Sequence, residues 1–396
     1  MPSMGSLYVN SRATSITIGR EEEAARSGSE DQTTETQASR HTIDPEPVSD
    51  SQIIDPDEDD PSKKLILSID FGTTYSSISY LPLSEGQRRD HVSSNEIRSI
   101  INYPDDKNED ESSQMKKEVP TEIMYPLDPK FRKRANLRRP TNTEGDVTDS
   151  ETEDEESDPD VMEVDSMGYN ISAMMSDAEE FKWGYKMHGA WGKPSTHFRQ
   201  TSKAMGRFKL LLDQSPATNE VRQTLRSTLK HLTSKKVVES EVGVIADFLT
   251  CLLRHAKSQL QSLGLYDDYQ VEIVLCVPAI WTQKACRDMQ AALLTAMRTA
   301  EFKGVDLSCQ AIENLFIVSE PEAAAAFILE TESSIQAGKS FVLLDAGGGT
   351  VDANTYKVNQ TQPLRLEKEV VEPGGGLCGS SVTRGLSLEC IFKFIQ

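Results

Sequence analysis

The sequence has few features that would place the chain outside a cell or in a membrane. Its six cysteines include no C-x-x-C pair, which argues against a disulfide framework or a closely spaced zinc site. The amino-terminal stretch has no apolar segment of the secretory type, and the longest apolar run, Val271–Trp281, is interrupted and far below the ~18 residues that a membrane helix needs. We therefore predict reduced thiols, a cytoplasmic location with the nucleus as the alternative, and no membrane partner.

Basic side chains also do not form the groove or base-reading pattern that a nucleic-acid partner would require, so we predict none. The formal net charge is −21, and it is unevenly spread. Residues 1–180 hold 18 basic and 41 acidic residues, whereas residues 181–396 hold 24 and 22. The acidic excess therefore belongs to the first part of the chain and carries no information about a ligand of the second.

Two stretches of that first part lack a periodic apolar pattern. Residues 1–62 are rich in Ser, Thr, Glu, Asp and Pro and predict a disordered acidic tail. Residues 127–180 hold a basic cluster between Lys130 and Arg139, then twelve acids and no base from Glu144 to Asp165. We predict a solvated, disordered basic/acidic insertion. A nuclear-import patch and acidophilic phosphorylation at Ser150 or Thr152 are the alternative interpretations.

Chemistry is indicated most strongly by Phe341–Val358, which reads FVLLDAGGGTVDANTYKV. Three consecutive glycines allow the backbone to approach an anion closely. Asp345 and Asp352 flank the turn and could hold a hydrated divalent cation, while the Thr350 hydroxyl adds a donor. An alternating strand follows the glycines instead of a helix, which excludes a P-loop and a Rossmann fingerprint. An ordinary glycine hairpin is the alternative for this stretch alone.

A second copy of the design lies at Leu65–Tyr80, LILSIDFGTTYSSISY. It again has an apolar strand, an aspartate (Asp70), a glycine with two threonines, and an alternating strand. Two such hairpins facing each other across a cleft would clamp a polyphosphate from both sides, with Mg²⁺ between them.

Between the hairpins, strand and helix patterns alternate. The expected elements are a short strand at Val119–Tyr125, an amphipathic helix at Glu241–Leu263, a buried strand at Val271–Val277, a helix from Thr282 to about Arg298, a strand at Leu315–Val318 and a helix opening at Glu320 and Pro321. This order is typical of an α/β layer with a parallel component.

Five motifs stand in one order along the chain: IDFGTTYS, VPAIW, SEPEAAAAF, DAGGGTVD and GGGLCGS. Together they resemble the nucleotide-binding domain of Hsp70-type chaperones in the actin-like ATPase superfamily, and the variant motifs resemble its divergent fungal branch. The resemblance covers about residues 64–126 and 181–390. It implies an α/β, actin-like ATPase (ribonuclease H-like) fold that binds ATP or ADP with Mg²⁺. Residues 63–126 and 181–340 would form the first lobe, and residues 341–396 would begin the second.

The resemblance also implies roles for single residues. Asp70 and Asp345 would orient Mg²⁺ through its water shell, and Glu320 and Asp352 would order the metal-bound or attacking water. Lys209 would reach the γ-phosphate, with a plain helix lysine as the alternative. The implied nucleotide contacts are Gly72, Thr73, Thr74, Tyr75, Gly347, Gly348, Gly349, Thr350, Gly375, Gly376 and Gly379. The last three match a turn that approaches the phosphates.

The sequence departs from the family after that turn. It ends at Gln396, before the family's adenosine clamp, interdomain linker and peptide-binding domain, so we expect a truncated lobe with apolar faces left uncovered. The alternative function is therefore a non-enzymatic remnant or a regulatory pseudo-ATPase that acts through its acidic segments. A sugar kinase that shares the hairpins is a third possibility. No protein client or co-chaperone is indicated.

Overall fold

The computed structural model describes residues 62–87, 89, 92–104, 116–137, 180–187, 202–331, 336–361, 364–377 and 379. All of these belong to one unit of the chain. The predicted tail lies outside the described residues except for Ser62, and so does most of the predicted insertion, residues 138–179.

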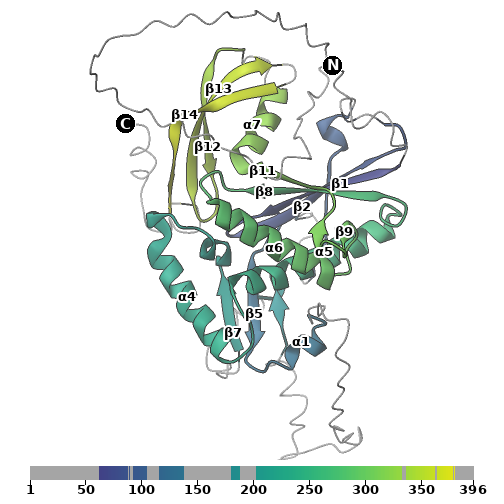
Figure 1. The fold of residues 1–396 in the computed structure, drawn as a ribbon, viewed down its shortest axis with the longest axis vertical. Helices are drawn as coiled ribbons and strands as arrows, with labels where there is room; N and C mark the ends of the chain where they lie inside the picture. The colour runs from purple at the N-terminus through teal and green to yellow at the C-terminus, as the bar shows by residue number, and fades with distance from the viewer. Residues whose placement is uncertain are drawn as a thin grey trace, which may run out of the picture. The chain divides into compact units, whose positions relative to one another are not determined.

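The first hairpin forms the centre of a six-stranded mixed sheet (Figure 1). Its strands are β1 (Lys64–Phe71), β2 (Tyr75–Leu83), β3 (Arg98–Ser99), β4 (Val119–Pro120), β8 (Gln270–Val277) and β11 (Leu315–Ser319). The order is β11-β8-β1-β2-β3, with β4 also pairing with β2. Strands β1, β8 and β11 are parallel and β2 is antiparallel to β1, which confirms the predicted parallel component.

A smaller sheet, in the order β6-β5-β7, continues from β4. It consists of β5 (Glu122–Pro126), β6 (Lys182–Trp183) and β7 (Ser202–Gly206). The single strand predicted at Val119–Tyr125 is thus two strands in two sheets. The chain changes sheets at Thr121, whose N–H donates to the Thr74 carbonyl at 2.8 Å and whose hydroxyl is 2.8 Å from that of Ser76.

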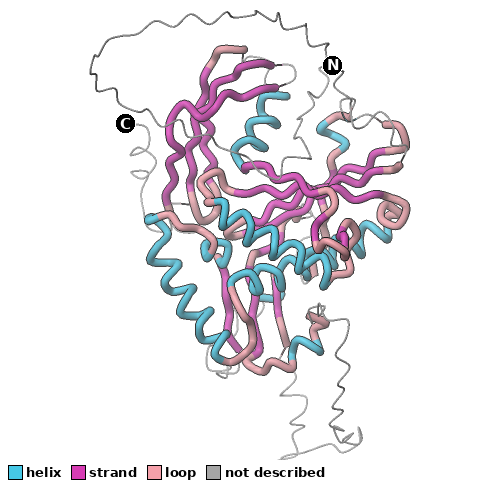
Figure 2. Tube along the Cα trace, in the orientation of Figure 1, coloured by secondary structure: helices cyan, strands magenta, loops and turns pink. Residues whose placement is uncertain are grey.

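Four of the α-helices and the central sheet share one hydrophobic core, to which α7 contributes no residue. Figure 2 shows the helices in cyan and the strands in magenta. The α-helices are α1 (Phe131–Arg134), α4 (Asn219–Ser234), α5 (Glu241–Ser262), α6 (Gln283–Thr299) and α7 (Glu320–Thr331), and the short 3₁₀ helices are η2 (Ser94–Glu96), η4 (Phe208–Leu211) and η5 (Pro216–Thr218). Thr282 accepts a hydrogen bond from the Ala285 N–H at the start of α6, as a capping residue should. Helices α5, α6 and α7 confirm the sequence-based predictions within a residue or two.

The second hairpin belongs to an antiparallel sheet of β12 (Ser340–Ala346), β13 (Val351–Thr361) and β14 (Leu364–Gly376). A two-stranded ribbon of β9 (Val305–Asp306) and β10 (Ala311–Ile312) completes the described strands. Within the described residues β12 pairs only with β13, and it leaves Val342 67% and Leu344 49% exposed. Phe327 on α7 is 60% exposed. These three apolar side chains are exposed in the described part of the chain.

The start of the predicted insertion is not a solvated loop. Phe131 is buried in an aromatic cluster with Tyr125 and Phe181. The Arg132 guanidinium makes a bidentate ion pair with Asp247 of α5, at 3.0 Å and 2.8 Å. The prediction of a solvated basic block is therefore wrong for Arg132, because a buried carboxylate on a helix 115 positions away needs its charge.

No helix among the described residues is long and apolar enough to cross a membrane. Cys251, Cys276, Cys286 and Cys309 have free thiols, while Cys378 and Cys390 lie outside the described residues. Mixed parallel and antiparallel sheets with packed helices establish an α/β fold for the described part.

Candidate functional site

Each hairpin carries an aspartate next to the end of its first strand. Asp70 is the penultimate residue of β1, and Asp345 is the penultimate residue of β12. Asp345 lies directly across the hairpin from Asp352, and Asp70 lies across from Ser77. Each hairpin therefore has an acid near its tip, Asp70 in the first and Asp345 in the second. The second hairpin has another acid, Asp352, on β13 opposite Asp345.

The tips of the two hairpins are in contact through their glycines and threonines. A Cβ built on Gly348 would lie 2.8 Å from the Thr74 Cβ and closer still to its hydroxyl oxygen, and one on Gly349 would lie 2.7 Å from the Thr73 Cγ2. Real Cβ atoms do not approach other atoms so closely. Only glycine at both positions therefore allows the second hairpin to come this near to the first.

Gly379 and Gly72 close the same region. The Gly379 N–H donates to the Gly349 carbonyl at 3.2 Å, and a Cβ on Gly379 would lie 2.5 Å from the Gly348 carbonyl carbon. A Cβ on Gly72 would overlap the Tyr75 carbonyl oxygen. The glycines thus form a tightly packed backbone cradle with no room for side chains.

Two of the predicted nucleotide contacts differ from expectation in their local structure. Gly375 and Gly376 are not in a turn, because they are the last residues of β14 and pair with Asp352 and Val351. The third glycine assigned to that turn, Gly379, lies against Gly348 and Gly349 of the second hairpin. The Tyr75 side chain is 42% exposed at the start of β2.

Lys209 is a buried residue of the site and not a plain surface lysine. Its side chain belongs to η4, is only 6% exposed, and donates to the Glu320 carboxylate at 2.5 Å. Its ammonium also lies 5.7 Å from the centre of the Trp281 ring. Burial lowers the pKa of Lys209, because it disfavours the charged ammonium. The nearby carboxylates, Glu320 first among them, together have the larger, opposite effect, so the pKa of the lysine lies above its ordinary value.

The three aspartates of the site repel one another and Glu320. Desolvation raises the pKa of Asp70, Lys209 lowers it, and Glu320 raises it again, with a net increase. The pKa of Asp345 is also raised, first by desolvation and then by Glu320. Asp70 and Asp345 keep solvent-exposed surface, and the neighbouring carboxylates add to the rise in both pKa values.

Asp352 has the largest shift of the three. Desolvation raises its pKa to about 6, a hydrogen bond from Thr350 works against that rise, and the carboxylates of Glu320 and Asp345 add to it. A carboxyl group with a pKa near neutrality can accept a proton from a ligand or a water at physiological pH.

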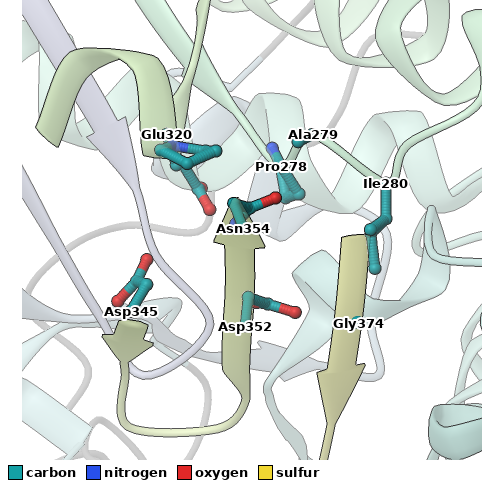
Figure 3. Close-up of a pocket in the computed structure, with 9 residues that line it drawn as sticks. Pro278, Ala279, Ile280, Glu320, Asp345, Asp352, Asn354 and Gly374 are labelled. Atoms are coloured by element: carbon teal, nitrogen blue, oxygen red, sulfur yellow. The ribbon is translucent and has the colours of Figure 1, made fainter. Parts of the chain in front are cut away.

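A hollow lies between the second hairpin and the start of α7 (Figure 3). It is open to solvent, and its volume is about 280 Å³ when the solvent space at its mouth is included. Its walls come from the turn after β8, the start of α7 and the strands β12, β13 and β14, through Pro278, Ala279, Ile280, Glu320, Pro321, Asp345, Asp352, Asn354 and Gly374. Asp345 of the predicted cation pair and the predicted water-ordering acids Glu320 and Asp352 therefore line one space, and Asp70 is not among its lining residues.

A phosphate ligand with a hydrated cation fits these residues. The Thr74 hydroxyl oxygen is buried beside Gly348 and has no hydrogen-bond partner among the described residues. Four carboxylates against one lysine leave an excess of negative charge that a cation would neutralise. The described residues hold no group of three His, Cys, Asp or Glu side chains placed for direct coordination of a metal ion.

Sequence reasoning missed two members of the site, Asn354 and Trp281. Asn354 is two residues after Asp352 and therefore shares its face of β13. The two-residue spacing that puts both side chains on one face was visible in the sequence. The position of Trp281 above Lys209 depends on packing between distant segments, and no local pattern indicates it.

Comparison with known proteins adds no assignment to this geometry. The sequence matches no family model, and no curated protein matches it. Functional conclusions therefore rest on the hairpins and on the side chains around them.

The Asp352→Asn variant should be more stable than the wild type near pH 7.5 but not near pH 4. Because the folded pKa of about 6 exceeds the ordinary 3.8, ionising Asp352 costs folding free energy as pH rises through this range. The asparagine does not ionise, so we expect a gain of about 1–2 kcal/mol at pH 7.5 after allowing for partial exposure. Urea unfolding at both pH values measures it. The exposed Asp268→Asn variant is the control, and an equal gain at both pH values would contradict the assignment.

Proposed function

We propose that the chain is an Hsp70-like, ATP-binding protein of the actin-like ATPase superfamily that clamps Mg²⁺·ATP between its two Asp-Gly-Thr hairpins and hydrolyses it. The observation that carries the proposal is the direct contact between the hairpin tips, where Gly348 and Gly349 pack against Thr74 and Thr73. A cytosolic or nuclear location and an actin-like ATPase fold are parts of the same proposal.

The arrangement of the strands supports this fold assignment. The order β11-β8-β1-β2-β3, with only β2 antiparallel to β1, β8 and β11, is the order expected of a ribonuclease H-like lobe. The sheet of β12, β13 and β14 repeats the antiparallel meander of β1, β2 and β3. A repeated meander with an acid at each tip is consistent with two lobes that face one ligand.

Each side chain has a defined task in this proposal. The backbone around Gly347 to Thr350 and the Thr73 and Thr74 hydroxyls would hold phosphate oxygens. Lys209, held by Glu320 at 2.5 Å, would add positive charge at the phosphates. Asp70 and Asp345 would hold the water shell of Mg²⁺, which when bound neutralises the charge on the phosphates. Asp352, with its pKa of about 6, would accept a proton from water.

A non-enzymatic role is the second candidate, either as a remnant or as a pseudo-ATPase that acts through the acidic segments. The observation that favours it is the exposed apolar surface of Val342, Leu344 and Phe327 beside the second hairpin, because such surface usually contacts another chain or segment.

Product analysis separates the two candidates. The full chain is incubated with Mg²⁺ and ATP labelled at the γ-phosphate, and ADP and phosphate are quantified beside the Asp352→Asn variant. We expect phosphate release from the wild type and at least tenfold less from the variant. Release that is absent from a folded wild type would favour the non-enzymatic role, whereas equal release from both proteins would show that Asp352 is not the proton acceptor.

A further inference from the structure

Asn354 is a buried polar residue whose side-chain oxygen has no hydrogen-bond partner in the described part of the chain. It is 3% exposed, and its Oδ1 atom makes no hydrogen bond there. It also lines the hollow that Glu320, Asp345 and Asp352 share. In Figure 3 its side chain lies between Glu320 and the segment Pro278–Ala279.

Packing alone does not explain an asparagine at this position. A buried amide oxygen without a hydrogen-bond partner destabilises a fold, because its lost hydration is not replaced. An apolar residue of similar size would not carry this desolvation penalty. The register places Leu343 opposite Asn354, so β12 offers no side-chain donor there. The unpaired oxygen points instead to a ligand with a hydrogen to donate.

Water is the donor that this site can hold. Asp352 and Asn354 lie on the same face of β13, two residues apart, both residues line the hollow, and each side chain carries an acceptor oxygen. A water that donates one hydrogen to each acceptor keeps a lone pair free to point elsewhere. Two acceptors on one rigid strand can therefore fix the direction of that lone pair.

We propose that Asn354 binds and orients the water that attacks ATP, an inference that rests on the proposed function. The water oxygen forms a bond to the γ-phosphorus, and the bond from that phosphorus to the β–γ bridging oxygen breaks with its electron pair left on ADP. One water proton passes to the Asp352 carboxylate and the other stays on the phosphate produced. Asn354 gains and loses no proton, so its part is to set the direction of attack.

The test compares two variants of nearly equal shape, Asn354→Val and Asn354→Thr, in the full chain. Threonine keeps an acceptor oxygen and valine does not, and both suit a strand. Three quantities are measured: the Kd of Mg²⁺·ATP, the single-turnover rate of hydrolysis, and the Tm of the nucleotide-free protein. We expect hydrolysis by the valine variant to be about tenfold or more slower than by the threonine variant, with both Kd values within about twofold of wild type.

The Tm of the nucleotide-free protein gives a readout that does not depend on turnover. If Oδ1 has no partner before nucleotide binds, valine should raise the Tm by roughly 2–6 °C over wild type. A structural role for Asn354 would instead lower the Tm of the valine variant and leave the ratio of hydrolysis rates near one.

The outcomes separate this inference from the function on which it rests. Equal hydrolysis by the two variants, or a wild type that binds Mg²⁺·ATP without hydrolysing it, overturns the role of Asn354 and leaves nucleotide binding intact. A folded wild type that does not bind Mg²⁺·ATP overturns both. A lower Tm for the valine variant identifies Asn354 as a structural residue and also overturns the inference.

Discussion

The Gly348→Ala variant should fold and yet hydrolyse ATP about 100-fold more slowly than the wild type. The added Cβ would lie 2.8 Å from the Thr74 Cβ, so the second hairpin must retreat by roughly 1 Å to regain ordinary contact, and a displacement of that size can reduce turnover about 100-fold. The effect depends on space and not on backbone strain, since Gly348 does not have a positive φ angle.

A rescue variant and a control accompany this measurement. Gly348→Ala combined with Thr74→Gly removes the clash from the other side and should recover part of the rate. Gly206→Ala is the matched control, because its Cβ would lie 3.5 Å from the nearest atom, an ordinary contact in β7 away from the hairpin tips. Turnover in Gly348→Ala equal to that in Gly206→Ala would show that the contact between the hairpins is not part of the active geometry.

The Asp247→Ala variant should lose about 3–5 kcal/mol of unfolding free energy, because it leaves a largely buried Arg132 charge without its partner. The Arg132 guanidinium donates to both carboxylate oxygens of Asp247, and the Tyr125 hydroxyl donates to one of them at 2.9 Å. Asp247 is 3% exposed, so water does not replace the missing acceptor. Denaturant unfolding followed by circular dichroism measures the loss.

Three further variants apportion that loss. Tyr125→Phe removes a single hydrogen bond and should cost about 1 kcal/mol. Asp247→Leu with Arg132→Met replaces both charges with apolar side chains and should recover much of the stability. Asp288→Ala breaks an exposed pair with Lys284 on α6 and should cost below about 0.5 kcal/mol. A loss in Asp247→Ala no greater than in Asp288→Ala would contradict the buried network.

Local patterns in the sequence were sufficient to predict the hairpins and the main helices. Glycines followed by alternating residues define β12 and β13, and the spacing of apolar residues defines α5. The capping threonine places the start of α6. Each of these features depends on residues within about four positions of one another.

Features that depend on distant partners were predicted poorly. Arg132 belongs to a basic cluster by sequence but pairs with Asp247 across 115 positions. Lys209 resembles an ordinary helix lysine until Glu320, 111 positions later, is placed beside it. Thr121 breaks a strand because it bonds to the first hairpin. In each case the decisive contact is long-range, so neither periodicity nor composition contains it.

The most direct test of the central claim is the binding of a fluorescent ATP analogue to the full chain, with Mg²⁺ and with a chelator, beside Asp345→Asn and the exposed control Asp268→Asn. We expect the wild type and Asp268→Asn to bind at least tenfold more tightly with Mg²⁺. Asp345→Asn should lose that dependence on Mg²⁺. With chelator present, it should bind the ATP analogue no more weakly than the wild type does, since one carboxylate that repels the phosphates is gone. Binding by the wild type that is absent or independent of Mg²⁺ would contradict the claim that two acidic hairpins clamp Mg²⁺·ATP.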